Sequence, residues 1–472
     1  MNALTDTARN RRTDLRHLST LAWPIFIGQL AVIANNVIDT AMTSRYSAVD
    51  LAALAIGASI YISVFVGASG VLQALSPLIG QLFGARDFAA IGREVKQGAW
   101  LALFLTLVGG LILAFPQPFL AIAHASPELT GKATLYLQIL ALALPATLGF
   151  KVYASLNTAL GRPKVLMLLQ VAALALKLPL NALFIFGAFG VPAYGGPGCA
   201  IATTVLAWLT LLAALLLLRF SPSYRPFRIF GSGFVMPTWR AQRALLGLGV
   251  PMGLSYLIEV TAFTFMALFI ARMGEIAVAG HQIASNLGGV MYMLPLSIAS
   301  ATGTLVAQAI GARDMVRARR VGNHGIILAG VVSALLGVII WLAHEQIARA
   351  YTPDVRIIAA AAPLFVFIAF YQVFDAVQVC AAFILRAYRI ALVPTIIYAV
   401  ALWGVGLGGG YLLGFDTTGA APLALRDAPG FWFGNSASIV IVAIGLVWYL
   451  GRIQRRVGYA SGTGAVSACS SA

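Results

Sequence analysis

Long apolar runs are the feature of this 472-residue chain that most limits its fold. A helix needs about 20 mostly apolar residues to cross the roughly 30 Å hydrocarbon core of a bilayer. The chain contains about 12 such runs, near 18–42, 51–80, 97–119, 133–159, 163–187, 198–218, 244–270, 276–307, 323–343, 357–385, 390–413 and 432–450. Transmembrane strands would instead alternate polar and apolar residues in short segments. The sequence therefore predicts an all-α integral membrane protein with about 12 transmembrane helices.

The composition agrees with this prediction. Only 10% of the residues are charged and 60% are hydrophobic, whereas an ordinary soluble chain is about 25% charged. A soluble enzyme of this length could not cover its surface with so few charges. A string of soluble domains is excluded for the same reason.

The basic residues predict how the chain is oriented. The formal net charge is +16, with 31 Lys and Arg residues in short clusters between the apolar runs. Most of them fall on one side of the membrane when the loops are assigned alternately to the two sides. The other side receives only Arg45, Lys132, Arg272, Arg349, Arg356 and Arg426. Since cytoplasmic loops carry the excess of Lys and Arg, both termini are predicted to be cytoplasmic, and nucleic acid is not an expected partner.

An internal repeat divides the chain into two halves. Residues 81–87 read QLFGARD and residues 308–314 read QAIGARD, and the same shift of 227 residues pairs Pro24 with Pro251. GARD itself fits a tight cytoplasmic turn after a helix, with a gating contact as the alternative. Six helices in each half give a parallel repeat, an arrangement that transporters use with substrate sites near the interface between the repeats. The predicted parts are a cytoplasmic segment (1–17), two six-helix lobes (18–218 and 244–452), a cytoplasmic linker (219–243) and a disordered tail (453–472).

Three acidic residues, Asp39, Glu259 and Asp375, fall inside the predicted helices. A carboxylate at a helix centre costs roughly 2.5–3.5 kcal/mol on insertion scales, so it is expected to face an internal cavity and a partner. Such a group can exchange protons or hold a monovalent cation. Either property would couple an ion gradient to a conformational change.

Polar neighbours accompany these acids at helical spacing, and one lysine is a candidate partner. The neighbours are Gln29, Asn36 and Thr43 around Asp39, Ser255 before Glu259, Tyr371 and Gln378 around Asp375, and the pair Gln282 and Asn286. They indicate cavity-facing stripes, although polar side chains also hold membrane helices together. Lys177 lies in the middle of a predicted helix in the same half as Asp39, which predicts an ion pair between the two.

Three classes of membrane protein were compared with these features. An enzyme would be expected to cluster its His, Cys or acidic residues, but the five histidines are dispersed and no HExxH motif is present. The sequence contains no GxxxxGK[ST] motif, which ATP-driven transport would need, and no recognisable selectivity filter, which a channel would need. A secondary transporter, not an enzyme, is therefore the preferred interpretation.

Several motifs resemble the multidrug and toxic compound extrusion (MATE) family, in its NorM-like branch. They are Pro24–Gln29, NNVIDTAM with Asp39, LSYLIEV with Glu259, GHQIASN (Gly280–Asn286) and YQVFDAVQV with Asp375. The resemblance implies two lobes in a V shape, a bacterial inner-membrane location and a monomer. It also implies alternating-access export of small organic cations or drugs against Na⁺ or H⁺, with membrane lipids as surroundings and no further cofactor.

The resemblance also suggests which residues couple the ion. Glu259, Asp375 and Tyr371 match a cation site in the second lobe that could hold Na⁺. Asp39 matches a first-lobe site together with Asn181 and Thr203. Supporting roles are expected for Asn36, Lys177, Gln282 and Asn286. The family branch commonly has Asn where this chain has Lys177, and an ammonium there would oppose Na⁺ binding. A lipid-linked oligosaccharide flippase of the same superfamily is the alternative function.

Overall fold

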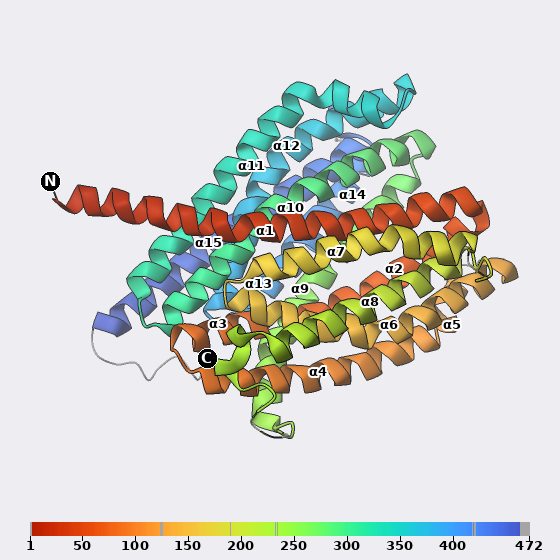
Figure 1. Ribbon diagram of the computed structural model, residues 1–472. Coiled ribbons are helices and arrows are strands. Elements are labelled where there is room, and N and C mark those ends of the chain that lie inside the picture. The colour runs from red at the N-terminus through yellow and green to blue at the C-terminus, as the bar shows by residue number, and fades with distance from the viewer. Residues whose placement is uncertain are drawn as a thin grey trace. The chain divides into compact units, whose positions relative to one another are not determined.

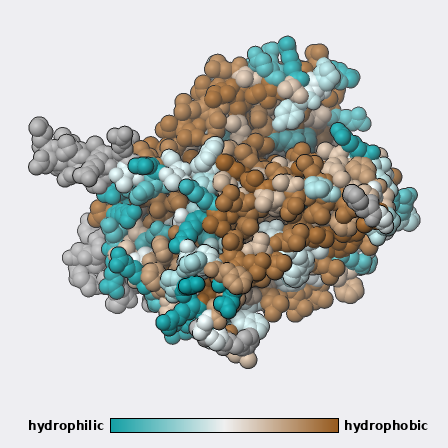
Figure 2. Space-filling model, viewed as in Figure 1, coloured by the Kyte–Doolittle hydropathy of each residue, from teal (hydrophilic) through white to brown (hydrophobic). Residues whose placement is uncertain are grey.

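The computed structural model describes residues 2–122, 126–188, 190–231, 233, 235–417, 419 and 422–462. Twelve helices among these residues are long and apolar enough to cross a membrane, and Figure 1 shows how they run. Both the all-helical fold and the predicted number of spans are confirmed. Large apolar side chains such as Leu212 and Trp208 are about half exposed, and apolar residues cover much of the face seen in Figure 2. That surface suits contact with lipid rather than water.

Several spans are continued by short helical pieces. The spans of the first half are α1 (Asn2–Tyr46), α2 with α3 (Ala48–Leu72 and Leu75–Gly84), α4 (Phe88–Ala114), α6 (Pro127–Ala159), α7 with the π-helical turn η1 (Pro163–Asn181 and Ala182–Phe186), and α8 (Gly196–Phe220). Those of the second half are α9 (Trp239–Ala271), α10 (Glu275–Gly311), α11 (Met315–Tyr351), α12 (Val355–Ala387), α13 with the π-helical η3 and α14 (Leu392–Tyr398, Ala399–Gly409 and Gly410–Gly414), and α15 (Ala428–Gly462). The short helices α5 (Gln117–Ile122), η2 (Pro222–Phe227) and η4 (Leu423–Leu425) lie between spans.

The chain forms two compact units. Pro24–Leu257 make up one, here called the N-unit, and Met1–Trp23 with Ile258–Ala472 make up the other, here called the C-unit. The chain passes from one unit to the other within α1 and within α9. The start of each of these helices therefore belongs to a different unit from its end. The boundaries of the units thus differ from those of the lobes expected from the repeat.

Small residues let the helices of the N-unit pack closely. Helix α6 packs against α2, α4 and α8. A Cβ atom added at Gly57 on α2 would lie 2.5 Å from the ring of Tyr136 on α6. Between α2 and α9, a Cβ at Gly70 would lie 2.6 Å from the Cα of Gly253. Since lipid gives helices no hydrophobic reason to associate, close van der Waals packing of this kind must hold them together.

Helix α12 lies at the centre of the C-unit and contacts α10, α11 and α15. A Cβ at Gly337 on α11 would lie 2.7 Å from the backbone oxygen of Ala369 on α12. Phe365 and Ile368 on α12 are fully buried, as is Ile340 one turn after Gly337, where the side chains of these helices form the core. The packing of α11 on α12 therefore depends on the absence of a side chain at Gly337.

The repeat is visible in the helix boundaries. Matching helix starts are Ala48 with Glu275, Phe88 with Met315, and Pro127 with Val355. These pairs are 227 or 228 residues apart, which agrees with the shift found in the sequence. The two halves therefore repeat one order of helices.

The GARD motif forms the same turn in both halves. Gly84 and Gly311 end their helices, as expected, but the left-handed residue that follows is an arginine, with φ of 60° at both Arg86 and Arg313. The next residue is an aspartate whose Oδ1 accepts a hydrogen bond from a backbone N–H of the following helix, at 3.0 Å for Asp87 and 2.9 Å for Asp314. The motif thus ends one helix and caps the next.

The linker contains a short helix, and part of the expected disordered tail is helical. Part of the linker expected at 219–243 forms η2, and its side chains and backbone are hydrogen-bonded to α4 and α6. Helix α15 continues to Gly462, so residues 453–462 of the expected disordered tail are helical. Residues 463–472, the remainder of that tail, lie outside the described residues.

Candidate functional site

The acid of the first half lies where three helices of the N-unit meet. Lys177 and Asn181 are one turn apart on α7, and both reach Asp39 on α1. Lys177 Nζ lies 2.8 Å from Asp39 Oδ1, and Asn181 Nδ2 donates to the same oxygen at 2.7 Å. Lys177 Nζ also donates to Thr203 Oγ1 on α8 at 2.6 Å. The ion pair predicted from the sequence is present, and Asn181 and Thr203 lie beside it.

This cluster contains its own counter-charge. The Lys177 side chain is 2% exposed and that of Asp39 is 14% exposed. Burying either charge alone would be costly, whereas the pair with its extra hydrogen bonds satisfies both groups. A cation that bound at Asp39 would therefore compete with an ammonium already in place. Asn36, one turn earlier on α1, is exposed and takes no part in these contacts.

The two acids of the second half share one cavity in the C-unit. The cavity has a volume of about 340 Å³ and is lined by Glu259 on α9 and by Tyr371 and Asp375 on α12. Asp375 is 2% exposed and Tyr371 is 7% exposed. The rest of the lining is mostly apolar or aromatic: Val260, Phe263, Thr264, Ser285, Gly288, Gly289, Tyr292, Ile368 and Trp432. The three residues expected at the second-half site are thus brought together.

A chain of neutral hydrogen bonds orients Asp375. Gln378, one turn later on α12, donates through Nε2 to Asp375 Oδ1 at 2.9 Å. The Tyr398 hydroxyl on α13 in turn donates to Gln378 Oε1. Asp375 is therefore held by an amide, whereas Asp39 faces an ammonium. Among the residues that the structure describes, none forms an ion pair with Asp375 as Lys177 does with Asp39.

Aromatic rings enclose the polar groups of this cavity. Phe263 and Trp432 each approach Tyr371 edge-on, with ring centroids 6.3 Å and 6.5 Å away. Apolar walls lower the local dielectric and so strengthen every charge interaction inside. Two residues that were expected to support the site, Gln282 and Asn286, are exposed and do not line this cavity. Gln282 Nε2 instead donates a hydrogen bond to Asn286 Oδ1 at 3.4 Å.

Sequence reasoning missed a buried acid at one end of the N-unit. Asp50 in the first turn of α2 is 2% exposed. Its Oδ1 lies 2.5 Å from Lys132 Nζ on α6, and its Oδ2 accepts a hydrogen bond from Gly196 N at the start of α8 at 2.7 Å. Asp50 joins three helices in this way. It was overlooked because it comes just before the apolar run near 51–80.

A second missed cluster lies in the C-unit. Asp14 on α1 is 4% exposed and accepts a hydrogen bond from Arg320 Nε on α11 at 2.8 Å. His324 Nδ1, one turn after Arg320, lies 3.4 Å from the same carboxylate oxygen. These contacts fasten the start of α1 to α11. The repeat offered a signal, because Arg320 pairs with Arg93 under the shift of 227 residues, but nothing in the sequence indicated the partner Asp14.

Comparison with known proteins gives one consistent family. A profile of the MatE family matches residues 24–183 and 251–412. The probable multidrug resistance protein NorM of Aromatoleum aromaticum is 40% identical over 92% of this chain and 93% of its own length. The multidrug resistance protein PmpM of Pseudomonas aeruginosa is 38% identical over 94% of this chain and 93% of its own. The crystal structure of the eukaryotic MATE transporter AtDTX14 matches with a TM-score of 0.84 at 19% identity, covering 95% of this chain and 98% of that one.

Proposed function

Because this chain belongs to the MatE family of multidrug and toxic compound extrusion transporters, we propose that it exports small organic cations and drugs by antiport with Na⁺ or H⁺. Relatives that match nearly its whole length are named multidrug resistance proteins. The observation that carries the proposal is the C-unit cavity that holds Glu259, Tyr371 and Asp375. Proteins of this family are transporters rather than enzymes.

The cavity suits a coupling cation on chemical grounds. A carboxylate in low-dielectric surroundings is costly unless it is protonated or paired with a cation. Glu259 and Asp375 supply two such groups, and the Tyr371 hydroxyl adds a third oxygen. A proton needs one of the carboxylates, whereas Na⁺ needs several oxygens at once. The donor set therefore serves either ion, and Na⁺, if used, is cargo rather than a resident metal.

Exchange follows from competition for the same negative charge. A coupling cation and a cationic substrate both gain free energy from the carboxylates of the cavity, so the binding of one weakens the binding of the other. A ligand shifts a conformational equilibrium only as far as its affinities for the two states differ. In this mechanism a cation from outside offsets one of the two negative charges of Glu259 and Asp375, which weakens the attraction for the cationic substrate. The substrate leaves outside, and the transporter alternates to release the cation inside.

The N-unit cluster supports this assignment by contrast. Lys177 already neutralises Asp39 at 2.8 Å and is itself almost completely buried. A coupling ion would gain little from a carboxylate that is paired with an ammonium. We therefore assign coupling to Glu259, Asp375 and Tyr371, and give Asp39, Lys177, Asn181 and Thr203 the supporting role of a fixed, charge-balanced junction.

The proposal also covers the moving parts of the transporter, its orientation in the membrane and its oligomeric state. We propose that the bodies that alternate are the six-helix lobes 18–218 and 244–452, joined by the linker 219–243. The basic residues favour cytoplasmic termini, and the bacterial relatives favour the inner membrane. We propose a monomer. The names of the relatives favour drug export over the flippase that the sequence left open.

Purified protein reconstituted in liposomes tests the proposal. A fluorescent organic cation is present at equal concentration inside and outside the vesicles, and an inward Na⁺ gradient or an inward proton gradient is imposed separately. Movement of the dye against its own gradient, driven by one of the two ion gradients and absent from protein-free vesicles, is the expected result. Dye movement that neither gradient accelerates would overturn antiport. Transport of a lipid-linked oligosaccharide with no dye movement would instead establish the flippase.

A further inference from the structure

A second, larger cavity lies in the N-unit, far along the chain from the acids discussed above. Its volume is about 660 Å³, within the range of about 300–1,000 Å³ that is usual for ligand sites. Helices α4, α6 and α8 form its walls, and the linker residues Ile229, Phe230, Gly233 and Val235 also line it. We call this cavity the linker groove.

The linker groove is apolar and reaches the surface of the helices. Val95, Leu156 and Leu211 line it, and no acidic residue is among its lining residues. Two of its leucines are strongly exposed, Leu103 on α4 at 56% and Leu215 on α8 at 43%. Exposed leucines within a span lie among lipid chains. The groove is thus continuous with the hydrocarbon region and is suited to a flexible alkyl chain.

Hydrogen bonds to the linker fix the other end of the groove. Lys96 Nζ donates to the backbone oxygen of Gly233 at 2.6 Å. Trp100 Nε1 donates to the backbone oxygen of Val235 at 3.0 Å. Both donors also line the groove. The linker is therefore held in place as part of the wall, so that an occupant would meet a preformed site.

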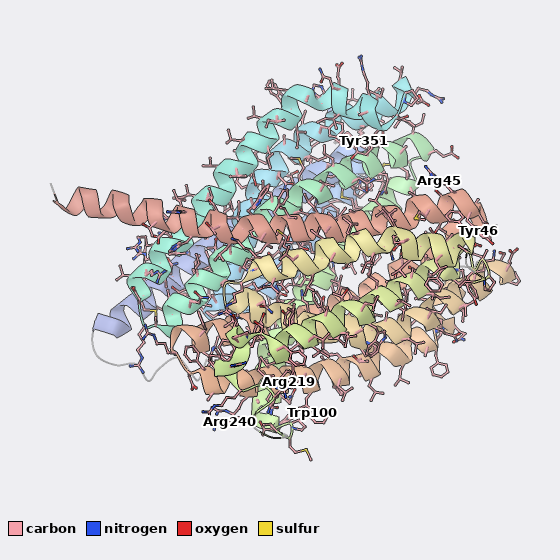
Figure 3. The ribbon with its side chains drawn as sticks, in the orientation of Figure 1. Arg45, Tyr46, Trp100, Arg219, Arg240 and Tyr351 are labelled. Carbon is pink, nitrogen blue, oxygen red and sulfur yellow. The ribbon has the colours of Figure 1, made fainter. Side chains whose placement is uncertain are left out.

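Basic residues lie close in the sequence to the residues that line this end. Arg219 follows Leu218, a lining residue of α8, and the linker adds Arg225, Arg228 and Arg240, all of them exposed. Figure 3 shows Arg219, Arg240 and Trp100 at the same end of the N-unit. The positive-inside pattern assigns this end to the cytoplasm. Basic pockets between helices on the cytoplasmic side are typical binding sites for acidic lipid headgroups.

We propose that the linker groove binds one anionic phospholipid of the cytoplasmic leaflet. One acyl chain occupies the apolar groove between α4 and α8, and the phosphate lies among Lys96, Arg219 and the linker arginines. A cationic drug would find no counter-charge here, because the lining contains a lysine and no acid. The linker groove therefore favours an anionic ligand, whereas the cavity with Glu259 and Asp375 favours a cation. Lipid binding in the groove does not depend on the coupling mechanism.

The test measures lipid binding by the full-length, delipidated protein. Dioleoylphosphatidylglycerol and the zwitterionic dioleoylphosphatidylcholine are titrated separately, and the rise in thermal unfolding midpoint gives an apparent affinity, since a ligand that binds only the folded state stabilises it. Phosphatidylglycerol is expected to bind at least tenfold more tightly than phosphatidylcholine. Equal affinities would overturn the proposed recognition of charge.

Two substitutions locate the site. Ala99 is an exposed lining residue of α4, and Ala99→Phe fills the groove, whereas Val108→Phe adds a ring to an exposed position of α4 outside it. Affinity for phosphatidylglycerol is expected to fall at least tenfold in Ala99→Phe and to stay unchanged in Val108→Phe. Arg219→Gln is expected to weaken phosphatidylglycerol several-fold without changing phosphatidylcholine. Equal affinities in Ala99→Phe and Val108→Phe would contradict the site.

A measurement on the unmodified chain guards against a folding defect in Ala99→Phe. Phosphatidylglycerol with a photoactivatable acyl chain is cross-linked to the protein, and the adducts are mapped by mass spectrometry. Adducts on groove residues of α4 and α8, competed away by unlabelled phosphatidylglycerol, are the expected result. Adducts spread over the other spans, with none enriched in the groove, would refute the proposal.

Discussion

Lys177 Nζ lies 2.8 Å from Asp39 Oδ1, with both side chains largely withdrawn from solvent. The buried acid Asp375 of the other half, which lies on a different helix of the repeat, instead receives a hydrogen bond from the Gln378 amide. One buried carboxylate is therefore paired with an ammonium of the chain itself, whereas the other is hydrogen-bonded to a neutral amide. This difference between the two sites supports the proposed assignment of ion coupling to the C-unit.

The first prediction concerns the stability of the Lys177–Asp39 pair. Breaking a buried ion pair by removing one partner costs about 3–5 kcal/mol, because the other charge is left uncompensated. Lys177→Ala and Asp39→Ala are each expected to destabilise the protein by this order. The double variant is expected to lose much less than the sum, measured by reversible unfolding in detergent.

An exposed pair serves as the control for this experiment. Arg349 and Glu345 are 70% and 58% exposed, and exposed pairs are worth about 0–1 kcal/mol. Arg349→Ala should therefore change stability little. Strictly additive losses at Lys177 and Asp39 would count against a coupled pair.

The second prediction concerns Asp14 and Arg320. The Arg320 guanidinium donates to the buried Asp14 carboxylate at 2.8 Å, and a hydrogen bond to a charged group contributes about 1.5–3 kcal/mol. Arg320→Ala is expected to destabilise the C-unit by this amount and to raise amide hydrogen exchange at the start of α1. Arg317→Ala, at an exposed position of the same helix, should leave exchange there unchanged. Equal exchange in the two variants would mean that Asp14 does not anchor the start of α1.

The third prediction tests close packing of α11 on α12. A methyl group at Gly337 would lie 2.7 Å from the backbone oxygen of Ala369, and overpacking of this kind typically costs about 1–3 kcal/mol. Gly337→Ala should lower the unfolding midpoint. Gly110→Ala on α4, where a Cβ meets nothing within 4 Å, should be neutral or slightly stabilising because alanine favours helix. A stable Gly337→Ala protein would show that α11 can move away from α12.

Much of the fold could be predicted because long apolar runs identify membrane helices. The run near 163–187, for example, corresponds to the span Pro163–Phe186. The Lys177–Asp39 pair was also predictable, because a buried lysine needs an acid and Asp39 was the one acid inside the predicted helices of its half. In both cases an unpaired polar or charged group in lipid costs so much free energy that few arrangements of the chain are possible.

Other features depend on contacts that sequence spacing does not reveal. Asp50 and Asp14 lie just outside the predicted apolar runs, where an acid is usually solvated, so their burial was not foreseen. The left-handed turn at Arg86 and Arg313 was not foreseen either, because glycine normally takes that conformation. The sequence predicted a linker but not its contacts, and Lys96 and Trp100 fasten it to α4 through its backbone oxygens. Gln282 and Asn286 were expected at the site from their helical spacing and the motif GHQIASN, neither of which shows what their shared face contacts.

Gradient-driven dye export by Asp375→Asn is the measurement that tests ion coupling in the C-unit most directly. Asparagine keeps the size of the side chain but removes the charge that a coupling cation neutralises. The variant should fold and insert normally, yet lose at least tenfold of the ion-driven rate in liposomes. Glu345→Gln, which removes an exposed acid of α11, should transport like the unmodified protein. Full gradient-dependent export by Asp375→Asn would contradict the assignment of coupling to this cavity.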